Sequence, residues 1–340
     1  MGKIICFGEI MLRLAPPGYL RFQQTPVFEA TYGGGEANVA VSLANYGMDA
    51  SYITKLPNNP IGQSAINEIR RYGVDTSQIV LGGDRIGIYY LEKGASQRAS
   101  KVVYDRKYSS ISEAEIKDFD WNKIFSGATW FHFTGITPAL GAKAAAVTTD
   151  ACKAARANGL TVSCDLNYRK NLWTKAEARE TMSKLMEYVD VLIANEEDSE
   201  SVFGIEAPNT DVSGGKISHE GYKEVAKILK DKFGFTKVTI TLRESISASD
   251  NNWAGMLYDG KEFYFSKTYP VHIVDRVGGG DSFGAGLIYA LLNGYGPQDT
   301  IEFAVAASCL KHSIEHDFNL VSADEVNALV KGDASGRVKR

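Results

Sequence analysis

The sequence has few cysteines, no long apolar run and no excess of positive charge. Its cysteines never form a CxxC pair, which argues against a metal site or a disulfide framework. They are Cys6, Cys152, Cys164 and Cys309, and their apolar contexts predict small buried side chains. No stretch approaches the roughly 18 apolar residues of a membrane span, and the N-terminus lacks the apolar run and cleavage site of a signal peptide. These absences predict a cytoplasmic protein.

The charge balance excludes another class of partner. Lysine and arginine number 37 and aspartate and glutamate 41, so the net charge is −4, and no basic excess indicates nucleic-acid binding. Hydrophobic residues make up 44% and charged residues 23% of the chain, as in ordinary globular proteins. The 33 glycines and 9 prolines follow no fixed period, which excludes collagen-like repeats. We therefore expect small-molecule partners, and neither nucleic acid nor a membrane.

Short apolar runs alternate with amphipathic stretches along most of the chain. The runs that predict strands are 3–7, 50–55, 129–133, 160–165, 189–194 and 237–241. The stretches that predict helices are 37–46, 62–72, 143–158, 175–188, 222–233, 281–292, 299–314 and 323–330. This alternation is typical of βαβ crossovers, so we predict an α/β fold with a doubly wound, mostly parallel sheet and helices on both faces. It never pauses at a linker, which favours one domain over 1–331 and a polar tail over 332–340.

Two segments interrupt the alternation, at about 12–32 and 86–107. The second contains two alternating runs, around Tyr89 and around Tyr104, as in an antiparallel ribbon. We predict that these segments form a small β-sheet lid over a site; a plain surface hairpin is the alternative. Because an isolated hairpin is only marginally stable in water, it should pack on something, such as the equivalent hairpin of a second subunit.

Three motif matches fail on their context. The segment 255–261 has P-loop spacing, but Glu262 stands where Ser or Thr would hold Mg²⁺, and a hairpin turn explains the segment better. The HxxEH pattern at 312–316 is followed at once by what looks like a helix end, which argues against a zinc-binding helix. The first strand leads into 8–11 without GxGxxG, so the dinucleotide fingerprint is missing.

The strongest signal is a run of three glycines, followed by an aspartate, that opens an apolar helix within 275–286. Glycines leave the backbone open to a ligand, and the free N–H groups of a helix start suit a phosphate. A carboxylate there would repel phosphate, but it makes sense if Asp281 accepts a proton from a hydroxyl that attacks the phosphate. Gly278, Gly279 and Gly280 would then form an anion hole. The alternative is a glycine-rich turn with Asp281 as the helix N-cap.

A second glycine cluster, at 33–35, opens another predicted helix. Its glycines would let a polyhydroxylated ligand approach the backbone, and Asn38 would supply an amide that both donates and accepts hydrogen bonds. Tight packing between the helix and a strand explains the cluster equally well.

The two glycine clusters, in this order, resemble the two signatures of the ribokinase-like (PfkB) family of carbohydrate kinases. The resemblance extends over nearly the whole chain, and the segments that are similar to the 2-keto-3-deoxygluconate kinase branch are 7–14, 134–140, 165–169 and 275–281. It implies ATP-dependent phosphorylation of a sugar-acid hydroxyl in the presence of Mg²⁺. The expected substrate is 2-keto-3-deoxygluconate, and the expected product is its 6-phosphate.

Carried over position by position, the resemblance implies that Asp281 is the catalytic base and that Gly278–Gly280 form the anion hole. The expected substrate contacts, with Asn38 from the pattern above, are Gly34, Asn38, Tyr89, Tyr104, Arg106, Arg169 and Asp317. The expected nucleotide contacts are Asn167, Asn195, Arg243, Gly278 and Gly280. Asn195 and Asp198 match the family's NxxE motif, which organises Mg²⁺ through water, and a monovalent cation near Asp275 is a further candidate.

Two features depart from the family pattern. Asp198 is shorter than the usual Glu, and 245–252 is interpreted as an inserted polar loop where the family has a Gly-rich turn beside the nucleotide. The alternatives to a sugar-acid kinase are a kinase for a neutral ketose and a catalytically weak sugar-acid-binding regulator. The retained Asp281 and triple glycine argue against the regulator, because a pure binder needs neither. A homo-oligomer formed through the lid sheet is expected in either kinase.

Overall fold

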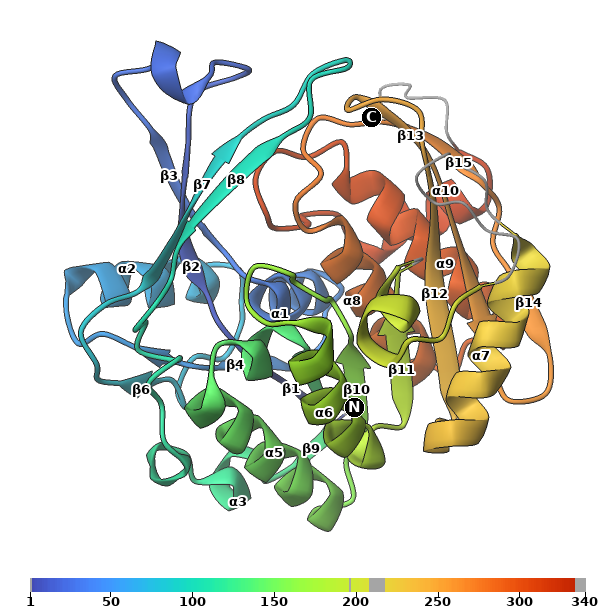
Figure 1. Cartoon of the computed structure of the whole chain (residues 1–340), viewed down its shortest axis with the longest axis horizontal. Coiled ribbons are helices and arrows are strands. Elements are labelled where there is room, and N and C mark those ends of the chain that lie inside the picture. Colours follow the sequence, from blue (N-terminus) through green and yellow to red (C-terminus); the bar gives the residue numbers. More distant parts are fainter. Residues whose placement is uncertain (1, 196, 208–217, 334–340) are drawn as a thin grey trace.

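The computed structural model describes residues 2–195, 197–207 and 218–333, and its centre is a twisted sheet between two layers of helices (Figure 1). The strand order is β14-β13-β12-β11-β10-β9-β1-β4, with β15 beside β13. The strands are β1 (Lys3–Phe7), β4 (Ala50–Ile53), β9 (Ala128–Thr134), β10 (Thr161–Asp165), β11 (Val191–Ala194), β12 (Lys237–Ser245), β13 (Asp250–Tyr258), β14 (Phe263–Phe265) and β15 (Tyr269–His272). Pairing is parallel from β4 to β12 and antiparallel beyond, which confirms the predicted mostly parallel α/β sheet.

The helices divide the apolar core into two clusters, one on each face of the sheet. The first cluster is built with α1 (Gly35–Asn45), α2 (Pro60–Arg70), α8 (Gly279–Leu292), α9 (Pro297–Lys311) and α10 (Ala323–Val330). The second is built with α3 (Trp121–Ile124), α5 (Ala142–Ala157), α6 (Lys175–Leu185) and α7 (His219–Phe233). The short elements are β5 (Lys55–Leu56), β6 (Val80–Leu81), α4 (Ile136–Ala139), and single turns at Phe22–Gln24, Ile116–Asp118, Met186–Tyr188 and Ser199–Phe203. Two buried faces explain why the parallel strands are apolar throughout.

A second, smaller sheet rises from the body of the protein, drawn in blue and cyan in Figure 1. Its order is β3-β2-β7-β8, from β2 (Met11–Ala15), β3 (Glu29–Gly33), β7 (Gly87–Glu92) and β8 (Lys101–Asp105). The antiparallel pair β7–β8 is the hairpin that the sequence predicts. Strands β2 and β3 fall in the other interrupting segment, and β2 pairs in parallel with β7. We call these four strands the lid sheet.

The tip of the lid sheet contacts the main sheet at the turn between β12 and β13. The backbone N–H of Ala248 donates to the carbonyl of Ser96 at 2.7 Å, and the N–H of Ser96 donates to Oγ of Ser249 at 2.9 Å. The polar loop expected over 245–252 is shorter in the structure, where only residues 246–249 lie between β12 and β13. The two strands simply continue outward as a paired hairpin, because Glu244 and Ser245 still pair with residues of β13.

The lid sheet is also fastened to the body by a buried charged side chain. Arg13, on β2, is fully buried and donates to Asp317 at 2.8 Å and to Asp275 at 2.5 Å. Burial alone would lower the pKa of this guanidinium, but the nearby carboxylates outweigh it and hold the pKa above its ordinary value. Asp275 also accepts the backbone N–H groups of Val277 and His316. Arg13 therefore joins the lid sheet to the segments on both sides of α8 and α9.

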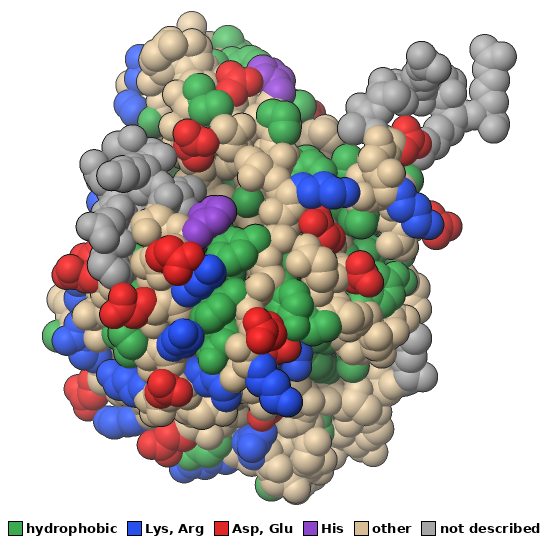
Figure 2. All heavy atoms as spheres, turned by 90° about the vertical axis from the view of Figure 1, so that its right-hand side faces the viewer, with side chains coloured by type: hydrophobic (Ala, Val, Ile, Leu, Met, Phe, Trp, Pro, Cys, Tyr) green, Lys and Arg blue, Asp and Glu red, His purple; other side chains and the backbone are tan. Residues whose placement is uncertain are grey.

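Several smaller expectations have clear outcomes. The cysteines are free; three are buried and Cys309 is partly exposed. Segment 255–261, which has P-loop spacing, forms the end of β13 and the turn to β14. Helix α9 ends at Lys311, so the HxxEH pattern at 312–316 lies after the helix. Among the described residues no helix has the length and hydropathy needed to cross a membrane. One face of the molecule carries charges of both signs close together (Figure 2). Most of the predicted polar tail lies outside the described residues.

Replacing Arg13 by Met should lower the free energy of unfolding by about 3–5 kcal/mol at neutral pH, because it leaves two buried carboxylates without their cation. Urea unfolding followed by tryptophan fluorescence measures the change. The matched control is Arg156→Met, whose guanidinium pairs with Asp190 but is 46% exposed; it should cost less than about 1 kcal/mol. Equal, small losses in the two variants would show that the buried pair does not stabilise the fold.

Candidate active site

A cavity of about 380 Å³ opens where the parallel strands end and the lid sheet begins. Ligands of open α/β sheets bind at the carboxyl ends of the strands, so this is the expected position for a site. Of the predicted site residues, the cavity is lined by Asp281, Gly278, Gly279, Gly280, Gly34, Asn38, Tyr89, Tyr104, Arg106, Arg169, Asp317, Asn167, Asn195 and Arg243. Asp198 is the exception, because it is buried behind the cavity wall.

The triple glycine forms a turn from which α8 starts. Gly278 is the N-cap, with φ of 83°, and a Cβ there would lie 2.1 Å from the carbonyl oxygen of Asp317, so only glycine fits. A Cβ on Gly280 would meet nothing within 4 Å. The N–H of Gly279 donates to the carbonyl of Arg276 at 3.4 Å, whereas the space beside Gly280 at the helix start is open to a ligand. Asp281 is in the first turn of α8 and is not its N-cap, which removes the capping alternative.

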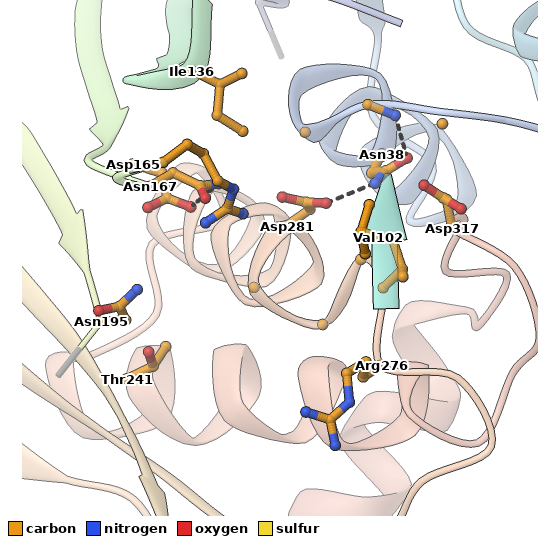
Figure 3. Close-up of a pocket in the computed structure, with 18 of the residues that line it drawn as sticks. Asn38, Val102, Ile136, Asp165, Asn167, Asn195, Thr241, Arg276, Asp281 and Asp317 are labelled. Atoms are coloured by element: carbon orange, nitrogen blue, oxygen red, sulfur yellow. Dashed lines mark hydrogen bonds between the residues drawn. The ribbon is translucent and has the colours of Figure 1, made fainter. Parts of the chain in front are cut away.

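The carboxylate of Asp281 is held in place by one hydrogen bond. Nδ2 of Asn38 donates to its Oδ2 at 2.6 Å, and Oδ1 of Asn38 accepts the N–H of Gly34 at 3.3 Å. Figure 3 shows Asp281 between Asn38 on one side and Asp165 and Asn167 on the other. Burial raises the pKa of Asp281 to about 6, although the bond from Asn38 lowers it. Asn38 was expected to contact substrate; in this structure its amide positions the candidate base.

The second glycine cluster is explained by close packing. A Cβ on Gly33 would lie 1.9 Å from Oδ2 of Asp317, and a Cβ on Gly34 would lie 2.0 Å from the carbonyl oxygen of Glu9. The packing alternative therefore holds at both positions. Gly35 differs, because a Cβ there would lie 3.3 Å from Thr134 and 3.5 Å from Asp281 and would be tolerated with a small shift.

The residues expected to bind a sugar acid reach the cavity from both the lid sheet and the main body, and the charges of their two arginines are not equally available. The guanidinium of Arg106 is paired with the buried carboxylate of Glu9, to which its Nε donates at 2.8 Å. Arg169 donates only to the carbonyl of Tyr168, at 3.2 Å, and no ion pair of the described residues includes it. Arg169 is therefore the guanidinium with free capacity for a carboxylate.

Asp317 and Tyr89 meet at the same end of the cavity. The hydroxyl of Tyr89 lies 2.6 and 2.7 Å from the two carboxylate oxygens of Asp317, which also accept from Arg13. Burial, and next the charge of Asp317, raise the pKa of Tyr89 well above its ordinary value, so the hydroxyl keeps its proton and donates. Asp317 therefore lines the cavity with its carboxylate already hydrogen-bonded to Arg13 and Tyr89.

On the other side of Asp281, polar groups gather at the ends of β10 and β11. Asp198 accepts the backbone N–H groups of Asn195 and Tyr168, at 3.0 and 3.1 Å, and so fixes Asn195 at the cavity wall. Asn167 has φ of 41°, a left-handed conformation that Asn tolerates, and it donates to Asp165 at 3.4 Å. Burial, Asp198 and Asp281 raise the pKa of Asp165 well above its ordinary value.

Those crowded acids fit a cation. Like charges that raise one another's pKa are relieved when a divalent ion lies between them, and Mg²⁺ prefers carboxylate, amide and water oxygens. Asp165 and Asn195 line the cavity and could approach such an ion, whereas Asp198 acts by holding Asn195. Within the described ranges, no group of three or more His, Cys, Asp or Glu side chains forms a closed metal site.

Sequence reasoning missed several lining residues. Asp165 and Arg276 belong to the quoted segments but were given no role; the position of Asp165 at a strand end was a usable signal. Asn251 and Trp253 line the cavity only because β12 and β13 continue outward as a hairpin. His312, from the rejected zinc pattern, packs against Trp253 with ring centres 5.0 Å apart.

Comparisons with known proteins agree with this architecture. The family profile described as pfkB family carbohydrate kinase matches residues 1–314. A 2-dehydro-3-deoxygalactonokinase of Haloferax volcanii is 30% identical over 336 residues, which cover 98% of each chain. A 2-dehydro-3-deoxygluconokinase of Thermoproteus tenax is 28% identical over 338 residues, which cover 97% of this chain and 95% of that one.

Solved structures give the same result. The crystal structure of 2-dehydro-3-deoxygluconokinase from Thermotoga maritima is 54% identical, has a TM-score of 0.94, and is matched over 98% of this chain and 100% of that one. A PfkB family carbohydrate kinase from Listeria grayi is 34% identical, with a TM-score of 0.89 and coverage of 97% and 99%. The profile, the relatives, the fold and the glycine turn with its aspartate lead to one conclusion: the chain belongs to the PfkB family of carbohydrate kinases.

Proposed function

We propose that this kinase transfers the terminal phosphoryl group of ATP to a hydroxyl of a sugar acid. The substrate would be 2-keto-3-deoxygluconate, which is another name for 2-dehydro-3-deoxygluconate, and the product its 6-phosphate. The observation that carries the proposal is the carboxylate of Asp281, held by Asn38 at the open end of a helix N-terminus. The substrate named for the Thermotoga maritima and Thermoproteus tenax proteins supports the choice of acid.

In this mechanism Asp281 accepts the proton of the substrate hydroxyl as that oxygen attacks the phosphorus of the terminal phosphate. The backbone N–H groups of Gly278–Gly280 then stabilise the negative charge on the transferred group. Asn38 keeps the carboxylate oriented and leaves the second oxygen, Oδ1, for the proton. Mg²⁺, held by Asp165 and Asn195 directly or through water, would neutralise charge on the phosphates.

A carboxylate on the substrate is favoured by the guanidinium of Arg169, which follows β10 of the main sheet. A neutral sugar offers nothing to the guanidinium of Arg169, whereas a carboxylate can accept paired, charge-assisted hydrogen bonds. Arg106 contributes less, because Glu9 already neutralises it. A kinase for a neutral ketose is the second candidate, and that ion pair is the observation that favours it.

The monovalent cation expected near Asp275 receives less support. The carboxylate already accepts from Arg13 and from two backbone N–H groups, and Nζ of Lys93 lies 4.0 Å away. An additional cation would compete with groups that are present, so we do not include it in the proposal.

We further propose that two copies of the chain associate through their lid sheets. Strand β8 is an edge strand, and Val103 on it is 54% exposed. The other exposed large apolar side chains of the lid sheet and its loops are Tyr19, Leu20, Val27, Phe28, Val102, Tyr104 and Tyr108. Val102 and Tyr104 lie on β8 with Val103, whereas Tyr19, Leu20, Val27 and Phe28 lie between β2 and β3. The apolar groups on the unpaired edge strand β8 favour pairing with an equivalent edge.

The direct test of the proposed function is ADP release across a panel of acceptors. The panel is 2-keto-3-deoxygluconate, its galacto epimer, gluconate, fructose and ribose, each with ATP and Mg²⁺. We expect the highest kcat/KM with 2-keto-3-deoxygluconate or its epimer and the lowest with the neutral sugars. Higher values with fructose would favour the ketose kinase, and no turnover with any acceptor would contradict a kinase altogether.

Replacing Asp281 by Asn should lower kcat by a factor on the order of 10²–10⁴, the range for loss of a positioned base, with little change in sugar-acid binding. In the parent enzyme kcat/KM should rise with pH through about 6, because the pKa of Asp281 lies at about 6 and only the ionised form accepts a proton. Steady-state kinetics from pH 5 to 8 measure both effects. A variant within a few-fold of the parent would rule out Asp281 as the base.

Replacing Arg169 by Lys keeps the charge but loses the planar fork. We expect kcat/KM for the sugar acid to fall by an amount equivalent to about 1.5–3 kcal/mol, the scale of a hydrogen bond to a charged group. The internal control is fructose or ribose, whose weak turnover should hardly change because neither has a carboxylate. Equal losses on acid and neutral sugars would mean that Arg169 supports the fold or the phosphates.

Replacing Val103 by Lys should convert a dimer into a monomer at micromolar concentration, because a charge at the centre of the apolar edge would be buried without a partner. Sedimentation velocity gives the mass directly. The control is Ile228→Lys, at a similarly exposed apolar position on α7, which should leave the mass unchanged. A monomeric parent protein, or a Val103→Lys protein that stays dimeric, would contradict association through the lid sheets.

A further inference from the structure

Arg276 is a half-buried guanidinium in the cavity wall with most of its hydrogen-bonding capacity unused. It lies in the segment before the glycine turn and donates one bond, from Nη2 to the carbonyl of Ala248 at 2.9 Å. No ion pair of the described residues includes it, although Asp275 is its neighbour in sequence. A guanidinium has five N–H donors, so four remain for other partners. Taking such a group partly out of water is costly unless an anion accompanies it.

A second guanidinium lines the same cavity. Arg243, on β12, faces this region, and burial followed by the charge of Arg243 lowers the pKa of Arg276. Two like charges at one wall repel each other, and an anion between them would turn that repulsion into attraction. The open N–H groups at Gly280 border the same cavity. Three sets of donors therefore line one cavity and could bind the same anion.

The position of Arg276 relative to Asp281 indicates which anion this is. Figure 3 shows Asp281 near the middle of the pocket beside Asn38, and Arg276 well away from both. In phosphoryl transfer the attacking and leaving oxygens lie roughly in line, so the leaving nucleotide is on the side of the transferred group opposite to the base. An anion at Arg276 therefore belongs to the phosphoryl donor and not to the sugar acid.

We propose that Arg276 binds the phosphates of the nucleotide, and that it does so as a side-chain donor beside the turn between β12 and β13, whose residues 246–249 include no glycine. The inference rests on the proposed function, because it assigns the donor half of the same site. Its bond to Ala248 fixes the guanidinium against the β12–β13 turn, and that turn also contacts Ser96 of the lid sheet. Arg276 would thus bind the phosphates of the nucleotide while it is hydrogen-bonded to a turn that contacts the lid sheet.

The test compares ADP with adenosine, because the two differ only in their phosphates. Isothermal titration calorimetry with the full-length protein and Mg²⁺ measures both affinities for the parent, Arg276→Gln and Arg276→Lys. We expect Arg276→Gln to bind ADP about 10- to 100-fold more weakly, as for loss of a hydrogen bond to a charged group, and adenosine unchanged. Arg276→Lys, which keeps the charge, should recover part of the loss. The KM for the sugar acid should stay within a few-fold of the parent value.

The matched control is Arg156→Gln, a surface arginine outside the cavity, which should bind both ligands like the parent. Equal weakening of ADP and adenosine by Arg276→Gln would overturn the proposal and assign the residue to support of the hairpin. A raised KM for the sugar acid with normal ADP binding would overturn it in favour of a carboxylate contact. A parent protein that binds neither ADP nor ATP would instead refute the proposed function, and this inference with it.

Discussion

The buried guanidinium of Arg13 is the constraint on which the arrangement of the site depends. It is supplied by the lid sheet, yet its partners Asp275 and Asp317 lie on either side of the segment that holds α8 and α9. Two buried carboxylates cannot remain ionised together without such a cation. Asp317 in turn leaves no room for a side chain at Gly33 or Gly278. One ion cluster therefore brings the lid sheet and both glycine turns together.

The cavity beside this ion cluster is lined by both acidic and basic side chains. Asp281 needs a raised pKa to act as a base near neutral pH, and burial provides it, while Asn38 keeps the carboxylate oriented. In the proposed mechanism Arg169 would bind the sugar acid and Arg276 the phosphates of the nucleotide, and both line the cavity. The acids at the ends of β10 and β11 favour a divalent cation where the phosphates would run.

Local patterns predicted the parts of the structure that depend on local sequence. Apolar strands alternating with amphipathic helices, and three glycines before Asp281, carry their meaning within a few residues. What the sequence did not reveal depends on partners far along the chain. Glu9 neutralises Arg106, the amide of Asn38 holds Asp281, and Asp198 accepts the backbone N–H of Tyr168. Nothing local marks these pairs, because each partner comes from another strand or helix.

The pairing of strands in the lid sheet could not be predicted from the sequence for a related reason. Segment 12–32 contains β2 and β3, but β2 finds its parallel partner in β7, beyond four strands and the helices α1 and α2. The extended β12–β13 hairpin is stabilised in part by Ser96 of the lid loop, so its polar residues alone indicated an inserted loop. Such pairings become visible only when the sheets are assembled.

The most direct measurement of the central claim is the chemical identity of the product. The protein is incubated with ATP, Mg²⁺ and 2-keto-3-deoxygluconate, and the mixture is followed by phosphorus NMR. The account predicts one new phosphomonoester, formed in equal amount to ADP and split by the two protons of a neighbouring CH₂, because the primary hydroxyl is phosphorylated. Free inorganic phosphate without an ester, or an ester on a secondary hydroxyl, would contradict it.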